Sequence, residues 1–157
     1  MIEIANQGLG KLDIKLEDNH PMILLAMEHA AKRALESVGE VAEGYAKEEL
    51  SKKQKHASGP DRPYVDTGRL RNSIANEVRG DGVYIGTNVE YALWVEVGTG
   101  IYASDGQGRK DVPWAYQDDE GNWHMTSGVM PVHFLKKAAT EHTEEYKRII
   151  KEAMENA

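Results

Sequence analysis

The sequence predicts an α+β fold in which a long N-terminal helix and a C-terminal helix pack against a small antiparallel sheet of hairpins. Near each end of the chain, apolar residues recur at helical spacing. Between these two stretches, short alternating or aromatic runs flank turns rich in Gly and Asp, which is the pattern of β-hairpins. The chain has 157 residues and no internal repeat, so we expect one domain over residues 1–157.

The first predicted element is a long helix at about residues 22–54. Its apolar or small residues follow one another at steps of four and three, which places them on one helix face. These residues are Met27, Ala31, Ala34, Val38, Val41 and Tyr45. At about 1.5 Å per residue the helix would be around 50 Å long, more than such a domain needs, so we expect part of it to project toward a neighbouring subunit. Gly39 and Gly44 indicate either a bend or break, or close helix packing.

A loop and a hairpin follow this helix. Residues 58–63 contain two prolines and a glycine, which end the helix. Asp66 or Thr67 then offers a side-chain cap to a short helix. Residues 74–88 alternate in polarity around Gly80-Asp81-Gly82, which predicts an antiparallel hairpin.

The next stretch is less regular. Residues 91–97 are apolar on nearly every side, which predicts a buried short helix or a strand that ends at Gly98-Thr99-Gly100. Residues 104–111 contain no apolar side chain and are expected to form a mobile surface loop. Residues 114–117 and 122–126 flank an acidic turn and predict a second hairpin.

The last predicted element is a helix that starts at Pro131 and runs to about residue 156, since proline is favoured at the first helical position. One face of this helix carries apolar and aromatic residues at helical spacing. That face consists of Leu135, Ala138, His142, Tyr146, Ile149 and Ala153.

The composition excludes several classes of function. No cysteine is present, which excludes disulfides, thiolate zinc sites and a cysteine nucleophile. The formal net charge of -7 disfavours binding to a phosphate backbone, so we expect no direct contact with DNA. No apolar run approaches the roughly 20 residues that span a bilayer, and the first four residues lack the features of a signal peptide. We therefore expect no membrane partner and a protein that is cytosolic when made.

No pattern in the sequence predicts a catalytic, metal or cofactor site. The histidines do not gather on one face, which favours structural or surface roles over metal ligation. Asp118, Asp119 and Glu120 are consecutive in a turn, so their side chains diverge and cannot hold one ion together. Four arginines are the candidates for a surface facing DNA, but acidic neighbours offer them local salt bridges: Arg62, Arg69, Arg71 and Arg79. We predict a protein that is not an enzyme and has no cofactor.

Three segments in order carry a family resemblance: residues 65–74 (VDTGRLRNSI), 83–92 (VYIGTNVEYA) and 94–100 (WVEVGTG). They resemble the bacteriophage family typified by lambda minor tail protein Z and its lambdoid neck homologues. The resemblance continues through Gly108-Arg109-Lys110, Pro113-Trp114 and Pro131-Val132-His133-Phe134-Leu135, and covers about residues 60–145. It departs from the family at Leu93, Val97, His133 and Lys137, positions where proline or an aromatic residue is common.

The resemblance implies a neck or tail-completion protein of a long-tailed phage, a prophage or a phage-tail-like particle. Such a subunit would act at the head-tail junction of the virion, as a ring-forming homo-oligomer that contacts other neck and tail proteins. We expect the helix at 22–54 or the loop at 99–112 to make these contacts. The alternatives are a tail terminator or head-closure stopper and, from another class, a phage nuclease or DNA-end binding factor.

The resemblance also implies which residues matter, in each case for structure and not for catalysis. Glycines within these motifs fix the direction of the chain at turns, because only glycine reaches positive φ at low cost. The residues are Asp66, Thr67, Gly68, Arg69, Leu70, Gly86, Tyr91, Ala92, Glu96, Gly98, Thr99, Gly100, Pro131, Phe134 and Leu135.

Overall fold

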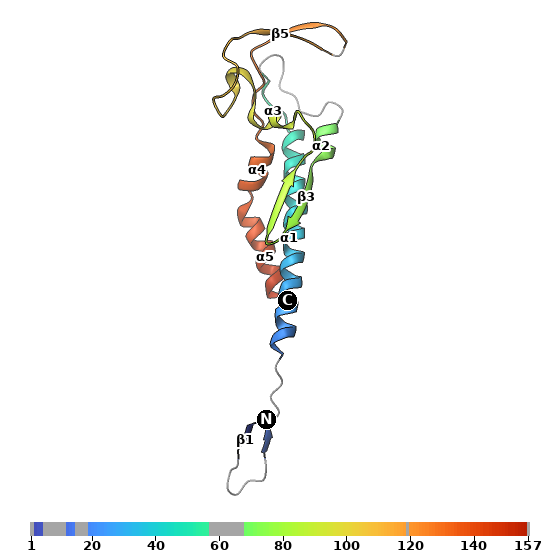
Figure 1. Ribbon diagram of the computed structural model, residues 1–157, viewed down its shortest axis with the longest axis vertical. Coiled ribbons are helices and arrows are strands. Elements are labelled where there is room, and N and C mark those ends of the chain that lie inside the picture. The colour runs from blue at the N-terminus through green and yellow to red at the C-terminus, as the bar shows by residue number, and fades with distance from the viewer. Residues whose placement is uncertain (1, 5–11, 15–18, 57–67, 119, 157) are drawn as a thin grey trace.

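The computed structural model describes residues 2–4, 12–14, 19–56, 68–118 and 120–156. It is an elongated α+β protein, as predicted, with helices along its length and small hairpins (Figure 1). The elements are β1 (Ile2–Ile4), β2 (Leu12–Ile14), α1 (His20–Ser51), α2 (Arg69–Ser73), β3 (Ala75–Arg79), β4 (Gly82–Gly86), α3 (Ala92–Val97), the 3-10 helix η1 (Gly100–Tyr102), β5 (Trp114–Gln117), β6 (Trp123–Thr126), α4 (Phe134–Thr140) and α5 (Thr143–Glu155).

The long helix α1 confirms the first predicted element and spans 32 residues. It runs unbroken through Gly39 and Gly44, so of the two alternatives for these glycines a break is excluded. Gly39 serves close packing, although its partner is a strand rather than a helix. A Cβ atom at Gly39 would lie 2.5 Å from the Asn76 side-chain oxygen of β3. The missing side chain therefore lets β3 lie directly against α1.

The buried face of α1 is shifted from the predicted one. Of the predicted residues only Ala34 and Val38 are buried, whereas Met27 is exposed. The fully covered positions recur at steps of four: Ala30, Ala34, Val38, Ala42, Ala46 and Leu50. A row of residues at this spacing is inclined to the helix axis, which suits neighbouring helices that cross at an angle. The mixed spacing of four and three assumed a straight stripe, and the actual neighbours select an inclined one.

The C-terminal region forms two helices, which corrects the prediction of one helix from Pro131. Residues 131–133 precede α4 because the backbone amides of Val132 and His133 donate to the carbonyls of Val95 and Glu96, at 2.9 and 3.2 Å. A second interruption separates α4 from α5 at His142, whose ring stacks on Tyr45 of α1 at 3.3 Å between centroids. These long-range contacts override the helical pattern of the local sequence.

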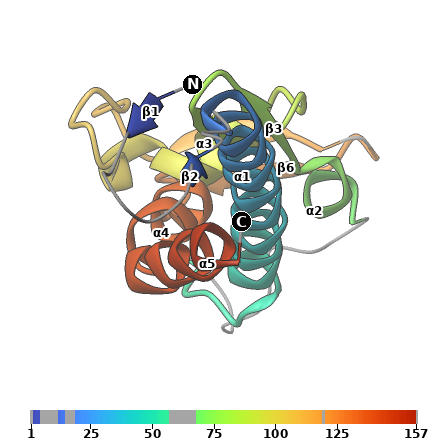
Figure 2. The same ribbon diagram turned by 90° about the horizontal axis from the view of Figure 1, so that it is seen from below.

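The predicted hairpins are present, but they do not join into one sheet. Each hairpin is a separate two-stranded sheet among the described residues. In β3-β4 Glu77 lies opposite Tyr84, and in β5-β6 Gln117 lies opposite Trp123. The hairpin β1-β2 was not predicted. Seen along its length, the molecule has α4 and α5 on one side of α1, and α2 and β3 on another (Figure 2). The hairpin β5-β6 lies at the far end with α3 (Figure 1).

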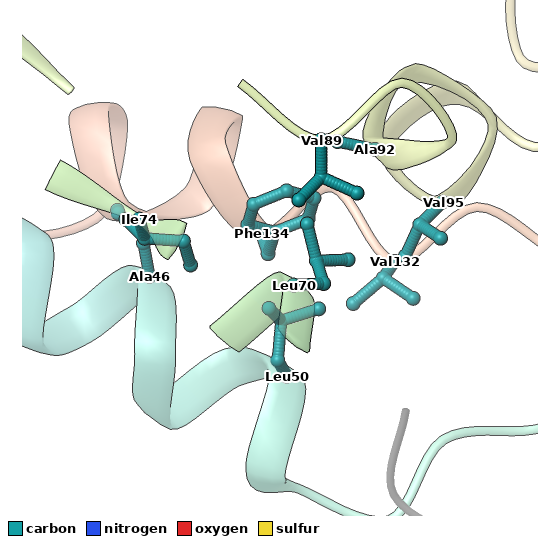
Figure 3. Close-up of a cluster of buried hydrophobic side chains, with 10 residues drawn as sticks. Ala46, Leu50, Leu70, Ile74, Val89, Ala92, Val95, Val132 and Phe134 are labelled. Carbon is teal, nitrogen blue, oxygen red and sulfur yellow. The ribbon is translucent and has the colours of Figure 1, made fainter. Parts of the chain in front are cut away.

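The main core lies where the C-terminal half of α1 meets α2, α3 and α4 (Figure 3). Its largest member is Phe134, the one phenylalanine of the sequence, with no exposed surface. The other buried members are Ala46, Leu50, Leu70, Ile74, Val89, Ala92, Val95, Val132 and Ala138. Among the described helices, none is long and apolar enough to cross a membrane.

Candidate assembly surfaces

The segment after α3 is held by a close backbone junction between residues 98–101 and 127–131. The amides of Thr99 and Ile101 donate to the carbonyls of Val129 and Ser127, at 2.9 and 3.1 Å. In return, the amide of Val129 donates to the Thr99 hydroxyl at 2.9 Å. This reciprocal bonding ties the end of α3 to the segment that precedes α4.

Glycines allow the two backbones of this junction to touch, and we therefore call residues 98–101 and 127–131 the glycine junction. Gly100 has a positive φ of 61°, and a Cβ atom there would lie 2.0 Å from the Ser127 carbonyl oxygen. Gly128 faces it, with the Thr99 carbonyl oxygen at the same distance from an added Cβ. Gly108 approaches Gly100 from the loop in the same way. The Gly98-Thr99-Gly100 motif was identified from sequence, but its dependence on Gly108 and Gly128 was not, because no local pattern links these positions.

The loop at 104–111 is more restrained than its composition indicates. Its residue Gly108 packs against the junction, and Ser104 donates from its backbone amide to the carbonyl of Val97 at 2.8 Å. The guanidinium of Arg109 lies 5.3 Å from the ring centroid of Trp114. The loop is therefore anchored at several points.

Glu96 connects α3 to α4 through its carboxylate. The two oxygens accept hydrogen bonds from the backbone amides of Leu135 and Lys136, at 2.8 and 3.0 Å. These amides belong to the first turn of α4 and have no partner within the helix. A negative charge is also favoured at a helix N-terminus. Glu96 therefore caps α4 from a position far away in the sequence.

The remaining motif residues fall into three groups. Leu70, Ala92 and Phe134 are buried in the core, and Tyr91 and Leu135 pack against it. Gly68 has a positive φ before α2, Arg69 begins that helix, Gly86 ends β4 and Pro131 adjoins Gly98. Asp66 and Thr67 lie outside the described residues, so their predicted capping role is untested. The motifs thus meet around one corner of the core, where α2, α3 and α4 converge.

One apolar surface is exposed at the end of the molecule that carries α3 and β5-β6 (Figure 1). Trp123 of β6 is 71% exposed, and Met125 lies two residues further along the same strand face. Leu93, Trp94 and Ile101 of α3 and η1 are also mainly exposed. We call these residues the distal surface; Tyr116 is exposed on the opposite face of the hairpin, where it stacks on His124. Exposed aromatic residues of this kind are typical of protein interfaces.

A second apolar surface is exposed at the other end, on the first turns of α1. Met22 is 73% exposed, and Ile23, Leu24, Leu25 and Met27 are each exposed by more than two fifths. The expectation that part of the long helix projects from the body is consistent with this arrangement. We call residues 22–27 the proximal segment.

The buried carboxylate of Glu49 has a structural role, because it joins two helices. Glu49 of α1 is buried and accepts hydrogen bonds from Lys52 and Lys137, the latter at 3.1 Å, which ties α1 to α4. Burial raises the pKa of Glu49, but the two lysines outweigh this effect and lower the pKa overall. In the described ranges, no group of three His, Asp or Glu side chains could hold a metal ion.

The acidic turn of the second hairpin also has a structural explanation. Asp118 accepts a hydrogen bond from His124 at 2.7 Å and others from the amides of Glu120 and Asn122. The His124 bond is the main reason that the pKa of Asp118 falls to about 2. This is the turn role predicted for Asp118.

An open hollow of about 600 Å³ beside β3-β4 is lined partly by Glu77 and Arg79, which pair with each other.

The comparisons with known proteins agree with a phage origin. The sequence model of the family described as "Bacteriophage HK97-gp10, putative tail-component" matches residues 16–98. This match includes all of α1 and overlaps the predicted resemblance at 60–145 as far as Gly98. No curated protein and no solved structure matches the chain. Because the matched region is more than half of the sequence, the chain belongs to the HK97-gp10-like family of bacteriophage tail components, which implies a structural role in the virion.

Proposed function

We propose that this chain is a non-enzymatic subunit of the head-tail junction, a neck or tail-completion component that works by assembling with copies of itself and with other neck and tail proteins. The observation that carries the proposal is the position of the two apolar surfaces, at opposite ends of an elongated body (Figure 1). A subunit with an exposed apolar surface at each end can contact two different neighbours at once, as a joining protein must.

The buried part of the molecule supports the same role. The motif residues hold the corner between α2, α3 and α4 in one shape through the core, the Glu96 cap and the glycine junction. Rigid support of an exposed surface reduces the entropy lost on binding. The distal surface is carried on this corner, which makes it suitable for a repeated contact in a symmetric assembly.

Complementation of a phage or prophage that lacks the gene tests this proposal. We expect the knockout to accumulate filled heads and separate tails in electron micrographs, and the wild-type chain to restore joined particles. The variant Trp123→Ser should not restore them, because it removes an exposed aromatic residue of the distal surface. The control Tyr84→Ser changes an exposed aromatic residue of β4, away from both ends, and should restore them. Joined, infective particles from the knockout would contradict a junction role.

Deletion of residues 103–111 would not isolate the contribution of the loop to contacts with neighbouring subunits. It would remove Gly108 from the junction and so disturb the fold as well as any contact. The double substitution of Lys110 and Asp111 by Ser keeps the anchored residues and changes only exposed side chains. Loss of joining by this variant would assign a contact to the loop.

A tail terminator or head-closure stopper is the alternative within the same class. It differs in the defect: loss of a terminator gives tails of irregular length, and loss of a stopper gives heads that lose their DNA. A nuclease or DNA-end binding factor is the alternative from another class. It predicts that Arg69→Ser with Arg71→Ser abolishes DNA retention in an otherwise folded protein, whereas a joining subunit keeps its heads filled.

A further inference from the structure

The proximal segment of α1 differs from the rest of the helix in having large apolar residues on every side. Successive residues of a helix are turned by about 100°, so Met22, Ile23, Leu24 and Leu25 point in four well-separated directions. All of them are exposed. A helix that is apolar all round is normally buried on all sides. This segment therefore needs a partner that encloses it, and a contact on one face does not suffice.

Among the described residues, the folded body of the same chain does not supply this cover. Burial along α1 begins only at Ala30, and from there α5, α4 and β3 pack against the helix. Figure 1 shows α1 extending past the end of α5. The proximal segment is thus left outside the body of the molecule.

The charge of the segment indicates what kind of partner fits. From Pro21 to Met27 there is no charged residue, while the whole chain carries -7. Two copies of so acidic a protein repel each other over most of their surfaces. They can approach without this repulsion at the neutral proximal segment, and its apolar residues are complementary to themselves. A charged partner, in contrast, would gain nothing from this segment.

We infer that the proximal segment forms the contact between copies of this chain, whose proximal segments pack together as a helix bundle. The inference rests on the proposed function in one respect, that the protein works by assembling with itself. It adds the location of that contact, at the end of α1 remote from the glycine junction. The distal surface is then left for other proteins of the tail.

Sedimentation velocity of the full chain tests the inference. We expect the wild type to associate at about 100 µM, a concentration at which a Kd of about 1 µM leaves little monomer. Leu24→Glu should raise the Kd at least about tenfold, because it places a charge in the middle of the contact. Leu93→Glu is the matched control, since it makes the same change on the distal surface, where Leu93 is 63% exposed. Equal effects of the two variants, or a monomeric wild type, would overturn the inference.

Cross-linking adds a positional test, which is clean because the chain has no cysteine of its own. The single substitution Leu24→Cys should give a disulfide-linked dimer under mild oxidation, whereas Glu36→Cys, on the part of α1 beside α5 and β3, should not. Dimers of Glu36→Cys alone would place the contact elsewhere. A monomeric chain whose residues 22–27 are protected from hydrogen exchange would contradict the inference, because the cover would then come from the same chain.

These measurements are independent of phage complementation. If the chain self-associates through the proximal segment but restores no joined particles, the contact stands and the junction role fails. If particles are restored equally by the wild type and by Leu24→Glu, the contact is dispensable and the inference fails while the junction role stands.

Discussion

Replacement of Gly100 by alanine tests whether the glycine junction holds the distal end of the molecule together. The added methyl group would meet the Ser127 carbonyl oxygen at 2.0 Å, far inside van der Waals contact. Because the obstacle is backbone, residues 99–101 and 127–129 must separate. Gly106 is the matched control, since its φ of +71° is similar but an added Cβ there meets nothing within 4 Å.

The two variants differ in the expected loss of unfolding free energy. A non-glycine residue at positive φ costs roughly 1–2 kcal/mol, which is the whole effect expected for Gly106→Ala. Gly100→Ala has the same cost and also weakens the hydrogen bonds from Thr99 and Ile101 across the junction. Each bond is worth about 0.5–1.5 kcal/mol net, so the total becomes about 2–5 kcal/mol.

Fluorescence and circular dichroism together separate this effect from general destabilisation. All three tryptophans, at positions 94, 114 and 123, lie in the region that the junction holds, so their emission reports on it during urea unfolding. The far-ultraviolet dichroism reports mainly on α1 and α5. We expect Gly100→Ala to shift the fluorescence transition more than Gly106→Ala does. Equal shifts for the two variants would refute the reasoning, because the close backbone approach would then cost nothing.

Three further predictions concern the core, the cap and the acidic turn. Phe134→Ala should reduce the free energy of unfolding by about 3–5 kcal/mol in urea, because it empties the centre of the main core; a loss under 1 kcal/mol would mean that the cavity collapses. Glu96→Ala should cost about 0.5–2 kcal/mol in thermal unfolding and Glu96→Gln less, because the amide oxygen still accepts one hydrogen bond from α4. The ionised form of Asp118 stabilises the hairpin fully above its unfolded pKa of 3.8, and this contribution is lost as the pH falls toward about 2. Asp118→Asn should therefore flatten the pH dependence of hairpin chemical shifts in that range, and an unchanged profile would assign it to another group.

The elements that sequence predicts well are those fixed by local patterns. The helix α1 was found from its apolar spacing, and both central hairpins from their turns, because neighbouring residues alone decide these structures. The elements that were wrong depend on distant contacts. The start of α4 is set by Val95 and Glu96, and the interruption before α5 is accompanied by the stacking of His142 on Tyr45. No residue within the C-terminal stretch indicates either contact.

The same limit on prediction applies to the glycine junction, whose local motif could be predicted from the sequence but whose long-range contacts could not. Gly98-Thr99-Gly100 was recognisable as a motif, but the need for glycine at 128 and 108 exists only because two remote backbones meet. The Glu96 cap is likewise separated by about forty residues from the helix it serves. A sequence can show that a residue is unusual for its place, whereas its partner becomes visible only when the chain is folded.

Within α1, the size of the apolar residues separates contacts inside the subunit from contacts outside it. From Ala30 onward the covered face is mainly alanine, since α4, α5 and β3 approach closely enough to leave little room. Before Ala30 the apolar residues are large, exposed and fit no single face, so no packing contact within the described part of the subunit accounts for their size or direction. Exposing such a segment favours aggregation unless another surface covers it, and a net charge of -7 opposes aggregation only in general. The same helix therefore carries two kinds of sequence, one shaped by the fold of the subunit and one consistent with a partner.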